Sequence, residues 1–402
     1  MKILMLVPFL PNAQTSGGQT RWYNLVKFLS ESHEITLFSL IKDDSERKFI
    51  PELNKYCKKV EVFNRSNSPW AFRNLFLTVF SPFPILLIRN FSFKERAAVK
   101  KELLNGDYDL IHAEAFYVMP HIPRTKVPSI QVEQTIWHKV YEHHVLTLTG
   151  IKIILKPFLM IDVLKLKFWE IYFWKKATKL CTVSPDDKMI MDKLIPGANV
   201  EVIPNGVDSA YYAAKKINKL QPPRVMYGVT NFEWLQNVEA VNTLIEKVWP
   251  KIREKYTDAK LWIVGRLIPE NIVNLSKVNN DIEITESIID PRDAYCGASI
   301  MVAPIGGSGG TRLKVLEAMA AGLPVVSTSL GVAGFHLKNG HEVVVSDTPE
   351  GLANETVKLL KDKKLRDQIG KAGQEFVRKN FDWKEIVKLH DPIYAKIKVT
   401  NL

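Results

Sequence analysis

The feature that most constrains the fold is an alternation of short apolar runs with helix-like segments, kept up over the whole chain. The runs are rich in Val, Ile and Leu, as in parallel strands that are buried on both faces. Between them apolar residues recur at helical spacing. The alternation predicts an α/β fold with parallel sheets and helices on both faces. Strands are expected at residues 2–7, 34–38, 60–63, 109–113, 129–133, 180–184, 200–203, 224–228, 260–265, 282–285, 300–303 and 324–327.

The alternation stops between Pro204 and Pro223, where Pro, Asn-Gly and lysines interrupt the pattern, and then restarts. A chain of 402 residues has the length of two typical domains. We therefore expect two Rossmann-like, doubly wound domains, 1–205 and 206–383, that face a central cleft. Ligands of such sheets bind beyond the carboxyl ends of the strands.

The net charge of +12 and the pI near 9.3 indicate an anionic partner. A phosphate-bearing ligand or an anionic membrane surface fits this charge. Nucleic acid does not, because the sequence holds no recognisable nucleic-acid module and its charge is spread over both halves. We expect no nucleic-acid partner.

The sequence offers no convincing metal site. The three cysteines lie far apart and form no C-x-x-C pair, a pattern that suits a reducing compartment. His143 and His144 are adjacent but lack a carboxylate at helical spacing. We expect no metal and no resident cofactor.

The N-terminus lacks a secretory pattern, since the apolar run after Lys2 ends at Pro8. The longest apolar stretch, 75–88, is broken by Pro82 and Pro84 and is shorter than the roughly 20 residues of a spanning helix. We expect a cytoplasmic protein.

The segment 303–324 has the most informative pattern. A strand ending at Ala303 is followed by a glycine-rich loop and by a helix expected to start near Thr311. A helix N-terminus with flanking glycines binds phosphate, and Arg312 and Lys314 add cationic donors. Glu317 follows on the same helix and could accept hydrogen bonds from a ribose diol. The alternative is a glycine-rich turn before a helix with surface charges.

This segment resembles the donor-binding signature of the retaining glycosyltransferase family 4, whose fold is GT-B, in its subgroup with a Gly-Gly-Thr-Arg loop. Further stretches are similar to family motifs. They are the glycine loop with Gly17 and Gly18, Ile203–Asp208 with Asn205, Thr230–Ala240 and Val264–Arg266. The resemblance spans nearly the whole chain and is strongest over 203–382.

The resemblance implies transfer of a sugar from a nucleotide-diphosphate donor, such as a UDP- or GDP-sugar, to a hydroxyl acceptor, with retention and without a metal. Glu317 would hold the ribose. Gly310, Thr311 and Arg312 would lie near the diphosphate or the sugar. Arg266 would lie near the phosphates. Gly17 and Gly18 would approach the diphosphate from the first domain. The fold also implies that the segment 384–402 packs back on that domain.

Two positions depart from the family pattern. Gly309 stands where many members have a second glutamate, and Gln134 stands near the position of a histidine beside the reacting sugar. Gln134 is a catalytic candidate by its position. Because Gln cannot act as a general base, its neighbour Glu133 is considered as a second candidate. His112, at the end of a predicted strand, is a candidate for the cleft or a structural histidine.

Two segments mix large apolar side chains with cations, 70–96 and 150–176. Such segments lie at the surface of anionic membranes, although an apolar face in the core with solvated lysines has the same sequence pattern. We expect a peripheral protein on the inner face of the plasma membrane, with a lipid-linked glycan as its acceptor.

The sequence therefore predicts a glycosyltransferase that extends a surface polysaccharide. Two alternatives stay open: a nucleotide-sugar epimerase on the same fold, and a non-catalytic glycan- or membrane-binding protein. Gly309 and Gln134 keep the second alternative open.

Overall fold

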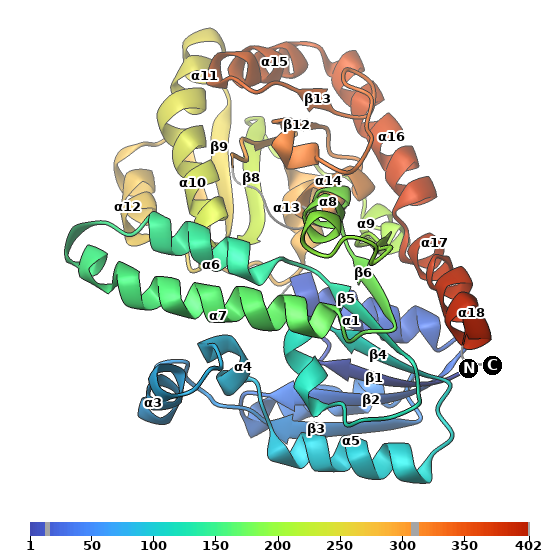
Figure 1. Cartoon of the computed structure of the whole chain (residues 1–402). Coiled ribbons are helices and arrows are strands. Elements are labelled where there is room, and N and C mark those ends of the chain that lie inside the picture. The colour runs from blue at the N-terminus through green and yellow to red at the C-terminus, as the bar shows by residue number, and fades with distance from the viewer. Residues whose placement is uncertain (13–16, 307–312, 401–402) are drawn as a thin grey trace. The chain divides into compact units, whose positions relative to one another are not determined.

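The computed structural model describes residues 1–12, 17–306 and 313–400, which form two compact units (Figure 1). The first unit comprises Met1–Pro204 and the segment that begins at Val387. The second unit runs from Asn205 to Ile386. The C-terminal helix thus belongs to the same unit as the N-terminal strand.

The first unit is built on a sheet of seven parallel strands in the order β3-β2-β1-β4-β5-β6-β7. Strand β1, inside the sheet, is apolar and buried from its second residue on, as expected for a strand covered on both faces. The strands are β1 (Lys2–Val7), β2 (Glu34–Ile41), β3 (Lys59–Asn64), β4 (Leu110–Glu114), β5 (Ser129–Glu133), β6 (Lys179–Thr182) and β7 (Glu201–Val202).

Helices connect these strands. The long helices α6 and α7 pack against each other (Figure 1). The helices of the first unit are α1 (Gly17–Leu29), η1 (Asp44–Phe49), α2 (Ile50–Leu53), α3 (Phe72–Phe80), α4 (Ile85–Arg89), α5 (Phe93–Asn105), η2 (Phe116–His121), α6 (Trp137–Leu146), η3 (Gly150–Leu155), α7 (Lys156–Trp174), α8 (Pro185–Leu194) and α18 (His390–Thr400).

The register of the first sheet brings the carboxyl ends of three strands to one edge. Ala113 pairs with Leu6 of β1, and Glu114 pairs with Val132 of β5. The carboxyl ends of β1, β4 and β5 therefore lie next to one another, which is where a doubly wound sheet binds its ligands.

The second unit is built on a sheet of six parallel strands in the order β10-β9-β8-β11-β12-β13. Strands β8 and β9 approach closely at Gly265, where a Cβ would lie 2.3 Å from the carbonyl oxygen of Thr230. The strands are β8 (Arg224–Asn231), β9 (Lys260–Arg266), β10 (Ile282–Thr285), β11 (Ile300–Ala303), β12 (Val325–Ser327) and β13 (Val344–Val345).

In this unit α14 ends at a glycine cap. Gly322 has a φ of 75°, and its N–H and that of Leu323 donate to carbonyls of the last turn. The helices are α9 (Ser209–Ala213), α10 (Leu235–Thr243), η4 (Leu244–Val248), α11 (Trp249–Lys255), α12 (Glu270–Val278), α13 (Pro291–Gly297), α14 (Leu313–Ala320), η5 (Leu330–Val332), α15 (Pro349–Lys361), α16 (Lys363–Asn380) and α17 (Trp383–Lys388).

The expected α/β fold is confirmed. Each predicted strand is present, and its ends agree within two residues except at β2 and β8, which each extend three residues further. Strand β13 has two residues and was not indicated by the sequence pattern. None of the described helices combines the length and the apolar character that crossing a bilayer requires.

Candidate functional site

In the second unit, Glu317 of α14 is held by tyrosines. Its Oε2 accepts a hydrogen bond of 2.8 Å from the hydroxyl of Tyr295, and the hydroxyl of Tyr212 bonds the same carboxyl group. Burial raises the pKa of Glu317, and the hydrogen bonds from the two tyrosines offset part of this rise. The side chain keeps part of its surface accessible. A carboxylate has about four acceptor positions, so it can accept further donors from a ligand.

Lys314 lies one turn before Glu317, and its ammonium group has a fixed position. Its Nζ donates to the hydroxyl of Tyr227 at 3.1 Å and to Oδ1 of Asn237. The same Nζ lies 4.8 Å from the centre of the Tyr227 ring. Tyr227 and Asn237 are both uncharged, so these two hydrogen bonds orient the ammonium group without neutralising its charge.

Arg266 is the last residue of β9, and its side chain is exposed. Its carbonyl accepts a hydrogen bond of 3.0 Å from the N–H of Phe232, which fixes the loop that follows β8. Arg266 thus ends β9, which pairs with β8, the strand whose Tyr227 hydrogen-bonds Lys314. The predicted residues Gly309, Gly310, Thr311 and Arg312 lie outside the described residues.

In the first unit, Glu114 at the end of β4 is the centre of a buried network. Its Oε2 accepts hydrogen bonds from Trp22 Nε1 at 2.9 Å and from Gln134 Nε2 at 3.1 Å. Arg21 Nε lies 3.6 Å from the same oxygen, and His112 Nε2 lies 3.1 Å from Oε1. Burial opposes ionisation of Glu114, but the charge of Arg21 and these hydrogen bonds outweigh it and lower the pKa to about 2.

The network brings two of the predicted residues together. A Cβ at Gly18 would lie 3.3 Å from Oε1 of Gln134 and 3.4 Å from the ring of Trp22. Gly18 belongs to the first turn of α1, and Gln134 directly follows β5. The side chain of Gln134 is partly exposed, and Glu114 orients its amide. The glycine loop and Gln134 thus meet at the carboxyl edge of the sheet.

Other predicted residues are buried. Glu133 is fully buried, and its Oε1 accepts from Gln131 and from the indole of Trp174. Burial and the neighbouring carboxyl of Glu170 raise the pKa of Glu133 well above its usual range. Glu133 is therefore arranged as a neutral core residue and not as an accessible catalytic group.

His112 and Asn205 are buried as well. Nδ1 of His112 lies 2.7 Å from the hydroxyl of Tyr394, and its other ring nitrogen faces Glu114, so the structure places it as a structural histidine. Asn205 is the first residue of the second unit.

Sequence reasoning missed Glu114. The available signal was its position: it directly follows the apolar run 109–113, at the end of a strand beside the glycine loop. Within residues 1–12, 17–306 and 313–400, no group of three or more His, Cys, Asp or Glu side chains is arranged to hold a metal ion. The three cysteines are buried and free.

The fold is that of the GT-B glycosyltransferases. Two solved structures share the fold over almost the whole chain. A glycosyltransferase from Rickettsia africae has a TM-score of 0.67 at 16% identity, covering 98% of each chain. HepE of Anabaena, solved with UDP and glucose, has a TM-score of 0.65 at 15% identity, covering 98% of this chain and 99% of HepE.

Matches to two domain families identify the family of the chain. A Glycosyltransferase Family 4 domain matches residues 15–211, and a Glycosyl transferases group 1 domain matches residues 223–362. Together they cover most of the chain, which is a glycosyltransferase of these families.

The chain is also similar in sequence to three bacterial proteins, among others. An uncharacterized 44.6 kDa protein in the cps region of Klebsiella pneumoniae is 22% identical over 96% of this chain and 97% of its own. The phosphatidyl-myo-inositol mannosyltransferase of Mycobacterium leprae is 24% identical over 77% and 79%. CapM of Staphylococcus aureus, a capsular polysaccharide biosynthesis glycosyltransferase, is 26% identical over 35% and 40%.

Proposed function

We propose that this protein is a retaining glycosyltransferase of the Gly-Gly-Thr-Arg subgroup. It transfers a sugar from a UDP- or GDP-sugar to a glycan or lipid-linked glycan in surface polysaccharide synthesis. The relatives in capsule synthesis and the UDP complex of HepE support this choice. The protein works at the cytoplasmic face of the membrane.

Glu317 is the observation that carries the proposal. A carboxyl group that is fixed by two tyrosine hydroxyls and still partly accessible suits the 2′- and 3′-hydroxyls of a ribose. Lys314, one turn away on α14, is a cation at a fixed position. Arg266 is a second cation, at the end of β9. A nucleoside diphosphate presents a diol and two phosphates, which a carboxylate and two cations can bind.

The proposed step breaks the bond between the anomeric carbon and the diphosphate and forms a bond to the acceptor oxygen on the same face. The proton of the acceptor hydroxyl passes to an oxygen of the leaving diphosphate. Lys314 and Arg266 stabilise the negative charge that develops there, a role that fixed cations can fill without a metal.

Gln134 positions the acceptor side in this scheme. Its amide is neutral at all working pH values, so it donates or accepts hydrogen bonds but does not remove the proton. Glu114 holds the amide nitrogen, and the amide oxygen lies beside Gly18, where the glycine loop lets a diphosphate approach.

The test is a thermal-shift screen with UDP, GDP, ADP, CMP and their sugar conjugates. A ligand that binds only the folded chain raises the melting temperature, by an amount equivalent to about 2.7 kcal/mol at a hundred times its Kd. One nucleotide should act selectively, and Glu317→Ala should abolish its effect. Glu375→Ala is the matched control, because Glu375 is an exposed carboxylate on α16.

Product analysis separates the alternatives. Release of the nucleoside diphosphate with sugar on the acceptor supports transfer, whereas release of a free epimerised sugar nucleotide supports epimerisation. If no nucleotide shifts the melting temperature of the unaltered chain, the transferase proposal fails, and the non-catalytic binding protein takes its place.

A further inference from the structure

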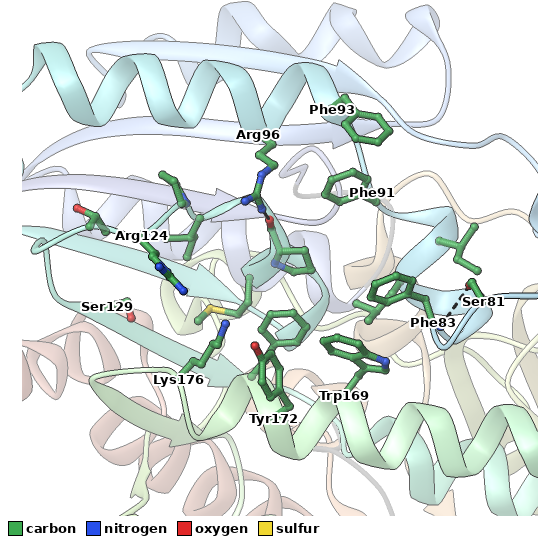
Figure 2. A pocket seen from close by; sticks show the side chains of 18 of the residues that line it. Ser81, Phe83, Phe91, Phe93, Arg96, Arg124, Ser129, Trp169, Tyr172 and Lys176 are labelled. Carbon is green, nitrogen blue, oxygen red and sulfur yellow. Dashed lines mark hydrogen bonds between the residues drawn. The ribbon is translucent and has the colours of Figure 1, made fainter. Parts of the chain in front are cut away.

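The first unit contains a groove of about 1100 Å³ that the transfer chemistry does not use. Its walls come from α3, α4, α5 and α7, and it reaches Ser129 and Thr178 at the amino ends of β5 and β6 (Figure 2). Gly18 and Gln134 lie at the opposite, carboxyl edge of this sheet. The volume exceeds that of most small-molecule pockets, which hold about 300–1,000 Å³.

The floor and one end of the groove are apolar. Leu87, Met119 and Phe173 line it and are buried members of the core of this unit. Phe83 packs against Trp169 with ring centres 4.8 Å apart. Water in such a groove lacks polar partners, so an apolar chain can displace it favourably.

The rim of the groove is positively charged. Arg73, Arg96, Arg124 and Lys176 line it and are exposed, and no Asp or Glu is among its lining residues. In Figure 2, Arg124 and Lys176 lie at one end of the groove, whereas Phe83, Phe91, Phe93 and Trp169 lie toward the other. A ligand that matches this order has an anionic head and an apolar tail.

The helices that wall the groove also carry apolar side chains on their outer surfaces. On α3, Phe72 is 82% and Phe80 is 73% exposed. On α7, Phe158 is 71% and Phe168 is 62% exposed, although the opposite face of the same helix is buried in the core. Exposed aromatic surface next to cations is typical of contact with a lipid headgroup region.

We propose that this groove binds one hydrocarbon chain of a phosphate-bearing membrane lipid, with the phosphate on Arg124 and Lys176. The lipid comes from the bilayer on which α3 and α7 lie, and in this the inference rests on the proposed membrane location. Chain and head are recognised together, so the protein selects anionic lipids instead of binding any apolar surface.

The test measures binding of monomeric n-alkyl phosphates to the full chain by titration calorimetry, below the concentration at which each probe forms micelles. Affinity should rise about fourfold per methylene from octyl to dodecyl phosphate, as expected for burial of a methylene group. Inorganic phosphate alone and a neutral dodecyl glycoside should each bind at least tenfold more weakly than dodecyl phosphate.

Two pairs of variants locate the site. Arg124→Gln with Lys176→Gln should weaken dodecyl phosphate binding about tenfold, the loss expected for charge-assisted contacts. Lys126→Gln with Lys175→Gln removes the same charge from exposed neighbours that do not line the groove and should have no effect. Leu77→Asp places a carboxylate in the groove, and Val79→Asp is its control on the outer surface of α3.

Several outcomes would overturn the inference: affinity that does not depend on chain length, equal losses in test and control variants, or binding to anionic vesicles but never to monomers. If the unaltered protein formed a dimer and Leu77→Asp dissociated it, a second copy of the chain would fill the groove instead. UDP binding is measured on the same samples. A normal UDP response without alkyl phosphate binding rejects the groove assignment alone, and the reverse result rejects only the donor assignment.

Discussion

At the scale of single residues, the carboxylates of this chain differ by what surrounds them. Glu114 and Glu133 end adjacent strands and are both fully buried. Glu114 faces the guanidinium of Arg21 and stays ionised, whereas Glu133 faces another carboxyl group and is neutral. The Coulomb interaction with the nearest charged group therefore decides which of the two can orient a polar side chain at the site.

Replacing Glu114 by Gln should strongly destabilise the first unit. The change leaves Arg21 buried without its counter-charge, at a cost of about 3–5 kcal/mol. The pKa of Glu114 is lowered from 4.5 to about 2, so its contribution is present above pH 4.5 and is lost as the pH falls through 2. Urea unfolding at pH 7 and pH 3 measures the size of the loss in unfolding free energy and the sign of its pH dependence.

Glu34→Gln is the control for this experiment. Glu34 forms a partly exposed ion pair with Lys58, with an Nζ–Oε1 distance of 2.9 Å, and such pairs contribute about 0–1 kcal/mol. Two results would contradict the assigned charge state of Glu114. One is a loss of unfolding free energy in Glu114→Gln as small as in the control, and the other is a loss that grows toward pH 3.

At the scale of elements, the junction of α1 and β5 assembles the first-unit site. Gly18→Ala puts a methyl group at 3.3 Å from the Gln134 amide oxygen and at 3.4 Å from Trp22. Because the crowded oxygen is the end of a side chain, the fold should persist while Gln134 is displaced. We expect turnover to fall about tenfold with a change in unfolding free energy below about 1 kcal/mol.

A double-mutant cycle with Gln134→Ala isolates this effect, since residues in contact show non-additive changes. If Gly18 acts through Gln134, Gly18→Ala should change turnover little once Gln134 has been removed. Additive losses would mean that the methyl group blocks the glycine loop itself, and the positioning role of Gln134 would be rejected.

The sequence predicted the elements well and the side-chain environments poorly. Every strand except the two-residue β13 could be predicted, because a strand buried on both faces requires a continuous apolar run. The lysines and aromatics of 150–176 did not reveal which face of α7 would be buried, because the helix is apolar all round. Glu133 could not be distinguished from Gln134 either, because the direction of each side chain depends on the strand register.

At the scale of the whole molecule, the chain returns to its first unit at the end. In α18, the Tyr394 hydroxyl lies 2.7 Å from Nδ1 of buried His112, and Asp391 lies 3.2 Å from Nε2 of His33. The C-terminal helix thus supports the same β4 strand that ends in Glu114. Packing at this helix should affect the Glu114 network but not the second unit.

Tyr394→Phe tests this division. The change removes the partner of Nδ1 of His112 in a site without water access, which costs about 1–3 kcal/mol. Hydrogen exchange should therefore increase in β1, β4 and β5, while β8, β9 and β11 keep their protection. Tyr211→Phe is the matched control, because the Tyr211 hydroxyl is partly exposed and makes a longer bond of 3.3 Å to Asp290.

The pattern of exchange also reports how the two units share their stability. If Tyr394→Phe raised exchange equally in both sheets, the units would unfold as one cooperative body, and a nucleotide bound to the second would protect the first. If only the first sheet loosens, a nucleotide that binds the second unit should protect β8 and β11 to the same extent in the variant and in the unaltered chain. The donor-binding unit would then bind its nucleotide without the support of α18, which is the outcome expected from the grouping of α18 with the first unit.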